Sequence, residues 1–190
     1  GGALALRWTA QLPGSLNLAL LDLTRANDLD AALHIAREAG VPAQNLLLGD
    51  SGGRIAWRLV GRIPTRLDGC DWAGWHPVDA ALQPELIDPP NARLWTANAR
   101  VTDGELLALI GDAGYALGAR QQQIANAMLA AAPIDEPALL ALQLDDRAIF
   151  LERWNTLLRD LVEPLSGAEW KDIADAAADW SGRASVDSSG

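Results

Sequence analysis

The sequence is short of the residues that build cross-links and metal sites. Its 190 residues include one cysteine, two histidines and one lysine. A single cysteine cannot form an internal disulfide, and Cys70 alone cannot build a zinc or iron–sulfur site. No apolar run approaches the roughly 20 residues that cross a bilayer. We therefore expect no disulfide scaffold, no bound metal or cofactor, and no membrane partner.

Positive charge is also scarce, because 25 acidic residues face 15 basic ones and the formal net charge is −10. The excess lies in residues 101–190, which hold 15 acidic and six basic side chains. An acidic surface repels a phosphate backbone, so nucleic acid is excluded as a partner. We expect these acids on the solvated faces of helices, the alternative being an acidic face that binds a partner. The 49% hydrophobic content is typical of a globular chain.

The chain starts at Gly1-Gly2, without an initiating methionine. No charged segment followed by an apolar stretch precedes the body of the sequence, so no signal peptide is predicted. We interpret the chain as an internal piece of a longer protein.

Residues 1–102 are predicted to mix helix and strand. Residues 3–10 are predicted to form a strand, and a helix is expected from Asn27 or Asp28 to Gly40. The clearest hairpin is 45–60, where two apolar runs flank an Asp-Ser-Gly-Gly turn. Residues 61–98 are rich in Gly, Pro, Asp and Trp and are expected to be irregular, with short extended pieces, the last at 93–97.

Residues 103–180 are predicted to be mainly helical, and 181–190 to form a loose polar tail. Apolar residues repeat at helical spacing in 106–110, in 118–132 before Pro133, and most strongly in 147–162. Pro137 follows Asp135, as in the first turn of a helix. The predicted fold class is therefore α+β.

Neither histidine predicts a catalytic or metal site from its neighbours. His34 has no second ligand four residues along its helix, and His76 lies in a Trp-His-Pro stretch. Trp72 and Trp75 could stack on a ring-shaped ligand, although packing beneath an irregular loop is the simpler interpretation.

The acidic pairs are better explained as helix caps than as general acids or calcium ligands. The pairs Asp135-Glu136 and Asp145-Asp146 both stand at helix starts, where carboxylates favour the helix dipole. Asp50-Ser51-Gly52-Gly53 is similar to the beginning of a calcium loop but lacks its spaced ligands, so we expect a hairpin turn.

Six stretches, in order along the chain, resemble the penicillin acylase family of N-terminal nucleophile hydrolases, which includes acyl-homoserine-lactone acylases. The stretches are 5–9 (Ala-Leu-Arg-Trp-Thr), 42–50 (Pro-Ala-Gln-Asn-Leu-Leu-Leu-Gly-Asp) with 53–57 (Gly-Arg-Ile-Ala-Trp) and 61–66 (Gly-Arg-Ile-Pro-Thr-Arg), 72–77 (Trp-Ala-Gly-Trp-His-Pro), 88–90 (Asp-Pro-Pro) with 96–100 (Thr-Ala-Asn-Ala-Arg), 117–120 (Leu-Gly-Ala-Arg) with Ile124, and 142–145 (Leu-Gln-Leu-Asp). Each stretch alone is weak, but the ordered set is specific.

The resemblance implies an amide hydrolase whose nucleophile is a serine hydroxyl at the first residue of a self-cleaved chain, with that residue's α-amine as base. It implies that Asn98 donates its side-chain amide to the oxyanion and that Arg120 orients the Asn and active-site water. The second Asn of the family's Thr-Ala-Asn-Asn-Arg pattern is Ala99 here. Gly1 is not a nucleophile, so the serine would lie upstream.

The same resemblance implies that hairpin 45–60 and a strand near 93–98 lie at the edge of an αββα sandwich, with 103–180 as a helical layer. It implies, as partners, the rest of a β chain, an α chain and a small acyl-amide substrate, and a periplasmic or secreted location. The family's calcium site is not carried over. The piece alone is predicted to hydrolyse no acyl amide. The alternative is a non-catalytic α+β binding module that uses the Trp-rich region 57–75.

Overall fold

The computed structural model describes residues 2–3, 6–11, 13–66, 72–112, 114–131 and 133–188. It divides into two compact units, residues 1–116 (unit 1) and 117–190 (unit 2). Among the described residues, no helix combines the length and apolar character needed to span a bilayer.

Unit 1 is built on a three-stranded antiparallel sheet with strand order β1-β2-β5. Strand β1 is Gln44–Gly49, β2 is Ile55–Val60 and β5 is Glu85–Ile87. The register of β1 and β2 runs from Gln44 opposite Val60 to Gly49 opposite Ile55, which confirms the predicted hairpin. Strand β5 falls within 61–98, where short extended pieces are expected, but its three residues are too few for a recognisable pattern of their own.

Asp50 makes the hairpin turn and ties it to the next element. Its Oδ1 accepts from the N–H groups of Gly52 at 2.8 Å and Arg54 at 3.1 Å, and its Oδ2 accepts from Leu29 N–H at 3.4 Å. All of these donors are backbone groups of the protein, as in an Asx turn. The turn interpretation of 50–53 is therefore confirmed.

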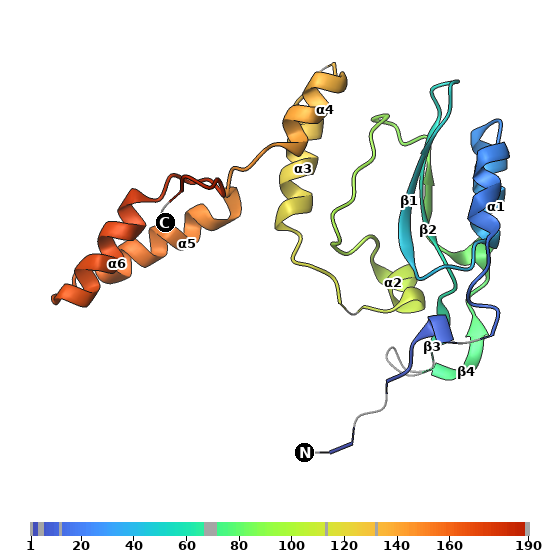
Figure 1. The fold of residues 1–190 in the computed structure, drawn as a ribbon, viewed down its shortest axis with the longest axis horizontal. Helices are drawn as coiled ribbons and strands as arrows, with labels where there is room; N and C mark the ends of the chain where they lie inside the picture. The colour runs from blue at the N-terminus through green and yellow to red at the C-terminus, as the bar shows by residue number, and fades with distance from the viewer. Residues whose placement is uncertain are drawn as a thin grey trace. The chain divides into compact units, whose positions relative to one another are not determined.

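Helix α1, Leu29–Glu38, covers one face of the sheet (Figure 1). Asp28 begins it by accepting from Ala31 N–H at 2.8 Å, as the sequence predicts. Leu29 and Leu33 are buried against Ala56 of β2, with Leu48 of β1 beside them. The helical spacing of apolar residues thus places one stripe on the sheet.

The opposite face of the sheet packs against helix α2, Gly104–Ile110, and against irregular chain. This second cluster contains Leu59, Ile63, Val78 and Ile110, with Trp57, Val101 and Leu109 partly buried against it. A two-stranded sheet of β3, Pro64–Arg66, and β4, Trp72–Pro77, and the short 3₁₀ helix η3, Ala80–Leu82, lie between β2 and β5 in the sequence. The sheet is therefore covered on both faces within unit 1.

Two predicted strands are wrong. Residues 6–8 are irregular and are followed by the 3₁₀ helices η1, Thr9–Gln11, and η2, Ala19–Arg25; positions 4, 5 and 12 lie outside the described residues. Residues 93–97 are also irregular. Ala92 and Asn98, with φ of 51° and 59°, have left-handed backbones on both sides of this piece and break the extended run that a strand needs.

Unit 2 consists of four helices in its described part: α3, Ala119–Ala130; α4, Glu136–Gln143; α5, Ile149–Val162; and α6, Ala168–Asp179. The first three match predicted helices, and α6 falls in the stretch expected to be helical. Helices α5 and α6 lie side by side as an antiparallel pair (Figure 1). Asp135 caps α4 by accepting from Ala138 N–H at 2.9 Å. The α+β class of the chain is confirmed.

Part of the expected loose tail is bonded to the segment before α5. Ala184 N–H donates to the Asp146 carbonyl and Ala148 N–H to the Gly182 carbonyl, both at 2.8 Å, and the Arg183 guanidinium pairs with the Asp146 carboxylate. Residues 182–184 are thereby held to the start of α5.

Candidate functional site

Asn98 is held in an unusual backbone conformation with its side chain exposed. Its φ of 59° lies in the left-handed region, which Asn tolerates better than most residues. Its neighbours Ala97 and Ala99 are 7% and 4% exposed, so both are packed into unit 1. Its carbonyl accepts from Ala116 N–H at 2.9 Å. The backbone at Asn98 is therefore fixed from both sides, and the residue is exposed.

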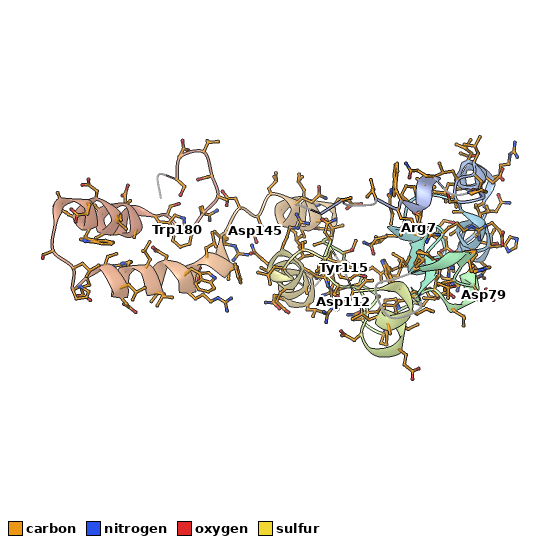
Figure 2. All side chains as sticks on the ribbon, turned by 90° about the horizontal axis from the view of Figure 1, so that it is seen from below. Arg7, Asp79, Asp112, Tyr115, Asp145 and Trp180 are labelled. Atoms are coloured by element: carbon orange, nitrogen blue, oxygen red, sulfur yellow. The ribbon has the colours of Figure 1, made fainter. Side chains whose placement is uncertain are left out.

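Asn98 lines a cavity of about 400 Å³ within unit 1. The walls come from the β1–β2 hairpin, the chain after β2, the Asn98 segment and α2. The apolar part of the wall includes Leu59, Ile63, Val101 and Ile110, and the polar part includes Thr9, Asn45, Arg62, Asn98 and Tyr115. Tyr115, labelled in Figure 2, follows α2 and donates from its hydroxyl to the Gly111 carbonyl at 3.4 Å. A concave wall that combines apolar side chains with several polar groups can hold a small molecule.

Gly61 brings the chain after β2 close to the segment before β1. Its φ is 104°, and a Cβ at this position would lie 2.4 Å from the Val41 carbonyl oxygen. Only glycine permits both the dihedral angle and the approach. The Gly-Arg-Ile-Pro stretch thereby places Ile63 and Arg62 at the cavity, and Arg62 Nη2 donates to the Glu38 carbonyl at 3.4 Å.

The sheet behind the cavity is braced by an Arg–Glu–Arg cluster. Arg58, 1% exposed, donates to Glu85 Oε2 and to the Ala80 carbonyl, both at 2.5 Å, and Arg37 donates to Glu85 Oε1 at 2.9 Å. Burial raises the pKa of Glu85, but the hydrogen bonds from Arg37 and Arg58 outweigh it and hold the pKa below its ordinary value of 4.5. The cluster joins α1, β2 and β5.

A second cluster fixes the chain where β5 ends. Arg54 donates to Asp88 and Asp30, each at 2.9 Å, and Asp88 also accepts from Ile55 N–H at 3.0 Å. The hydrogen bonds from Arg54 and then from Ile55 lower the pKa of Asp88. The Asp-Pro-Pro stretch thus has a structural partner in the hairpin.

Arg120 lies in the first turn of α3, in unit 2, while Asn98 lies in unit 1. Arg120 lines a separate cavity of about 400 Å³, whose wall includes Ile124, Leu142 and Phe150. One turn along α3, Gln123 Nε2 donates to Asp145 Oδ2 and to the Arg147 carbonyl, both at 3.0 Å. The start of α3 is therefore bonded to the segment that precedes α5, and each predicted site residue is positioned by its own unit.

Asp145, labelled in Figure 2, is the charged centre of this contact. Arg147 Nε and Nη2 donate to its two oxygens at 2.7 Å each. These bonds, followed by that from Gln123, hold the pKa of Asp145 well below its ordinary value of 3.8. The prediction that the acidic pair 145–146 caps a helix is wrong: the N-cap of α5 is Ala148, without a side-chain cap, and Asp145 and Asp146 instead form ion pairs with Arg147 and Arg183.

The remaining candidates form no cluster in the described part of the chain. His34 and His76 are both exposed. Among the described residues, no group of three or more His, Cys, Asp or Glu side chains could hold a metal ion. The side chains of Trp72 and Trp75 lie outside the described residues.

One hydrogen-bonded pair at the Asn98 cavity is not predicted by the sequence. Trp57 Nε1 donates to Asn45 Oδ1 at 2.8 Å across the hairpin, and Asn45 lines the cavity. The only signal in the sequence was that both residues belong to stretches that carry the family resemblance.

Comparison with known proteins agrees with that resemblance. The penicillin amidase family model matches residues 1–190. Two strains of Pseudomonas fluorescens have relatives named acyl-homoserine lactone acylase QuiP, which are 28% and 27% identical over 164 residues; each alignment covers 79% of this chain and 20% of the relative. A Pseudomonas putida protein with the same name is 33% identical over 103 residues, covering 47% of this chain and 12% of the relative. The chain thus spans about a fifth of the length of the first two relatives, and it belongs to the penicillin amidase family.

Proposed function

We propose that this chain is part of an acyl-amide hydrolase and supplies Asn98 as the side-chain donor to the oxyanion. The observation that carries the proposal is that Asn98 is exposed and lines a cavity, where a left-handed backbone between two buried alanines holds it. A donor carried on a fixed backbone needs little reorganisation when charge develops. Family membership and the names of the relatives point to the same chemistry.

In the proposed reaction the nucleophile is a serine that is the first residue of a mature chain. This serine is not among these 190 residues. The serine oxygen attacks the carbonyl carbon of the amide while the α-amine accepts the hydroxyl proton. The carbonyl electron pair moves to oxygen, and the Asn98 Nδ2–H group donates to that oxyanion. Collapse of the intermediate breaks the C–N bond, the departing amine takes the proton, and water releases the acyl group by the same steps.

Arg120 has the lesser role of orienting the Asn and active-site water in this proposal. This role is proposed because the Leu-Gly-Ala-Arg stretch at 117–120 resembles the family and because the start of α3 is fixed by the bond from Gln123 to Asp145. The acyl-amide substrate and the chains that complete the site are proposed on the same basis.

The test is Asn98→Gly in the full-length protein that contains this chain. Glycine keeps the left-handed backbone and removes only the amide, so we expect kcat to fall about 10²–10³-fold with little change in KM. The matched control is Asn91→Gly, because Asn91 is exposed and lies outside the cavity.

Self-cleavage must be checked beside the kinetics, by the chain sizes of the purified variant. A mature Asn98→Gly enzyme with kcat within threefold of the parent would contradict the oxyanion role. If the variant does not cleave itself, its two mature chains are expressed separately and refolded together, so that self-cleavage is not required for the kinetic test.

A further inference from the structure

We infer that Asn45 is a second substrate-binding residue, which donates from its side-chain amide to an oxygen on the amine side of the scissile bond. The inference rests on the proposed amide hydrolysis and names a feature of its substrate. Asn45 and Asn98 line the same cavity but come from segments about fifty residues apart in the sequence.

The bond from Trp57 decides which end of the Asn45 amide is available. An indole N–H can only donate, so the atom 2.8 Å from Trp57 Nε1 must be the amide oxygen. The amide group is planar, so fixing Oδ1 also fixes the direction of Nδ2. The available end is therefore a donor.

The Asn45 Nδ2 group makes no hydrogen bond to any other residue that the structure describes. Asn45 is only partly buried and lines the cavity wall. Trp57 itself is packed against the cluster of Leu59, Ile63, Val78 and Ile110, so the residue that holds the amide is anchored in the core. An oriented donor in the wall of a cavity selects a ligand oxygen.

The chemistry of the substrate places that oxygen in the amine part. Asn98 is proposed to take the scissile oxygen. In an acyl-homoserine lactone, the substrate in the relatives' names, the lactone ring carries further oxygens on the amine side of the amide bond. A lactone carbonyl accepts a hydrogen bond, whereas a hydrocarbon ring of the same size does not.

The experiment compares Asn45→Asp with the parent in the full-length protein. Aspartate keeps an oxygen for Trp57 Nε1 and removes both amide hydrogens. We expect KM for an N-acyl-homoserine lactone to rise about tenfold, the value of one hydrogen bond of ordinary strength, with kcat within threefold. KM for the corresponding N-acyl-cyclopentylamine should not rise. The variant should therefore lose the parent's preference for the lactone.

Asn91→Asp is the matched control, because Asn91 Oδ1 also accepts a hydrogen bond, from Arg93 N–H at 3.3 Å, at an exposed site outside the cavity. Trp57→Phe should weaken the lactone preference through loss of amide orientation. An unchanged preference in Asn45→Asp would overturn the inference, as would an equal loss for both substrates. Normal kcat in Asn98→Gly would instead overturn the oxyanion proposal, so the two failures are distinguishable.

Discussion

The two units bury their apolar side chains very differently. In unit 1 the sheet has one cluster on each face, centred on Leu33 and Ala56 on one side and on Leu59 and Ile63 on the other. In the described part of unit 2 the buried apolar residues are Ala125, Met128, Val162 and Ala177, while leucines of α5 are 40–60% exposed. Helix α5 has a clear helical period of apolar residues, as α1 has, but only the apolar face of α1 is buried within its own unit.

The units differ in the same way in their ion pairs. Glu85 joins Arg37 and Arg58, which are 48 and 27 residues away in the sequence. In unit 2, Asp145 pairs with Arg147 two residues away and Lys171 with Asp175 four residues away. Arg183 pairs with the more distant Asp146, but its side chain is 54% exposed, whereas that of Arg58 is 1% exposed. Long-range pairs are broken on unfolding, whereas neighbours in sequence stay close in the unfolded chain. Unit 1 should therefore depend more strongly on its charges.

Glu85→Gln should produce the largest loss of stability. It leaves the Arg58 guanidinium buried without its counter-ion, and breaking a buried ion pair in this way costs about 3–5 kcal/mol of the free energy of unfolding. Asp145→Asn should cost much less, because Arg147 is half exposed and remains hydrated. Urea unfolding at pH 7, followed by circular dichroism, gives both values. Equal losses would remove the distinction between the units.

Acidification should reduce the difference in the free energy of unfolding between Glu85→Gln and the parent. The pKa of Glu85 is lowered by folding, so its charge stabilises the fold above the ordinary value of 4.5, and this contribution is lost as the pH falls through the lower folded pKa. Below that pH the parent carboxyl is also neutral. The two unfolding curves should therefore converge on acidification, and a constant difference from pH 7 to pH 2 would contradict the assignment.

Leu33→Ala should have the next largest effect. Leu33 is 1% exposed between α1 and the sheet, and truncation of such a leucine costs about 2–5 kcal/mol. Leu161→Ala is the matched variant in α5, where the side chain is 60% exposed and the expected cost is about 0.5 kcal/mol. Urea unfolding measures both. A Leu161→Ala cost equal to that of Leu33→Ala would mean that the face of α5 is buried in solution.

The elements that the sequence predicts correctly are those with local signals. Helix α1 has a capping Asp28, the hairpin has its Asp-Ser-Gly-Gly turn, α3 ends before Pro133, and α4 has Pro137 in its first turn. Each signal acts within a few residues and does not depend on the rest of the chain.

The elements that the sequence does not predict depend on distant chain. The strand β5 exists through its pairing with β2, and residues 93–97 fail to form a strand because they lie between two left-handed residues. The bond between Trp57 and Asn45 depends on the hairpin register. The functional role of Asn98 is a prediction from the family resemblance. Neither the position of Asn98 in the sequence nor the residues beside it specify an oxyanion donor.

Gly61→Ala should have the smallest of the three stability effects, although it should still distinguish the units. Its Cβ would meet the Val41 carbonyl oxygen at 2.4 Å, so backbone must move in addition to the strain of φ at 104°, for a cost of about 3 kcal/mol. Gly167→Ala in unit 2 also has positive φ, at 136°, but its Cβ would meet the end of the Glu169 side chain, which can rotate away. Its cost should be about 1 kcal/mol, from backbone strain alone.

Thermal unfolding of both variants measures the difference, and Gly53→Ala, with φ of 83° and open space around the new Cβ, is the control for strain within unit 1. If Gly61→Ala were no more costly than Gly53→Ala, the close approach beside Val41 would not constrain the chain that leads into the cavity.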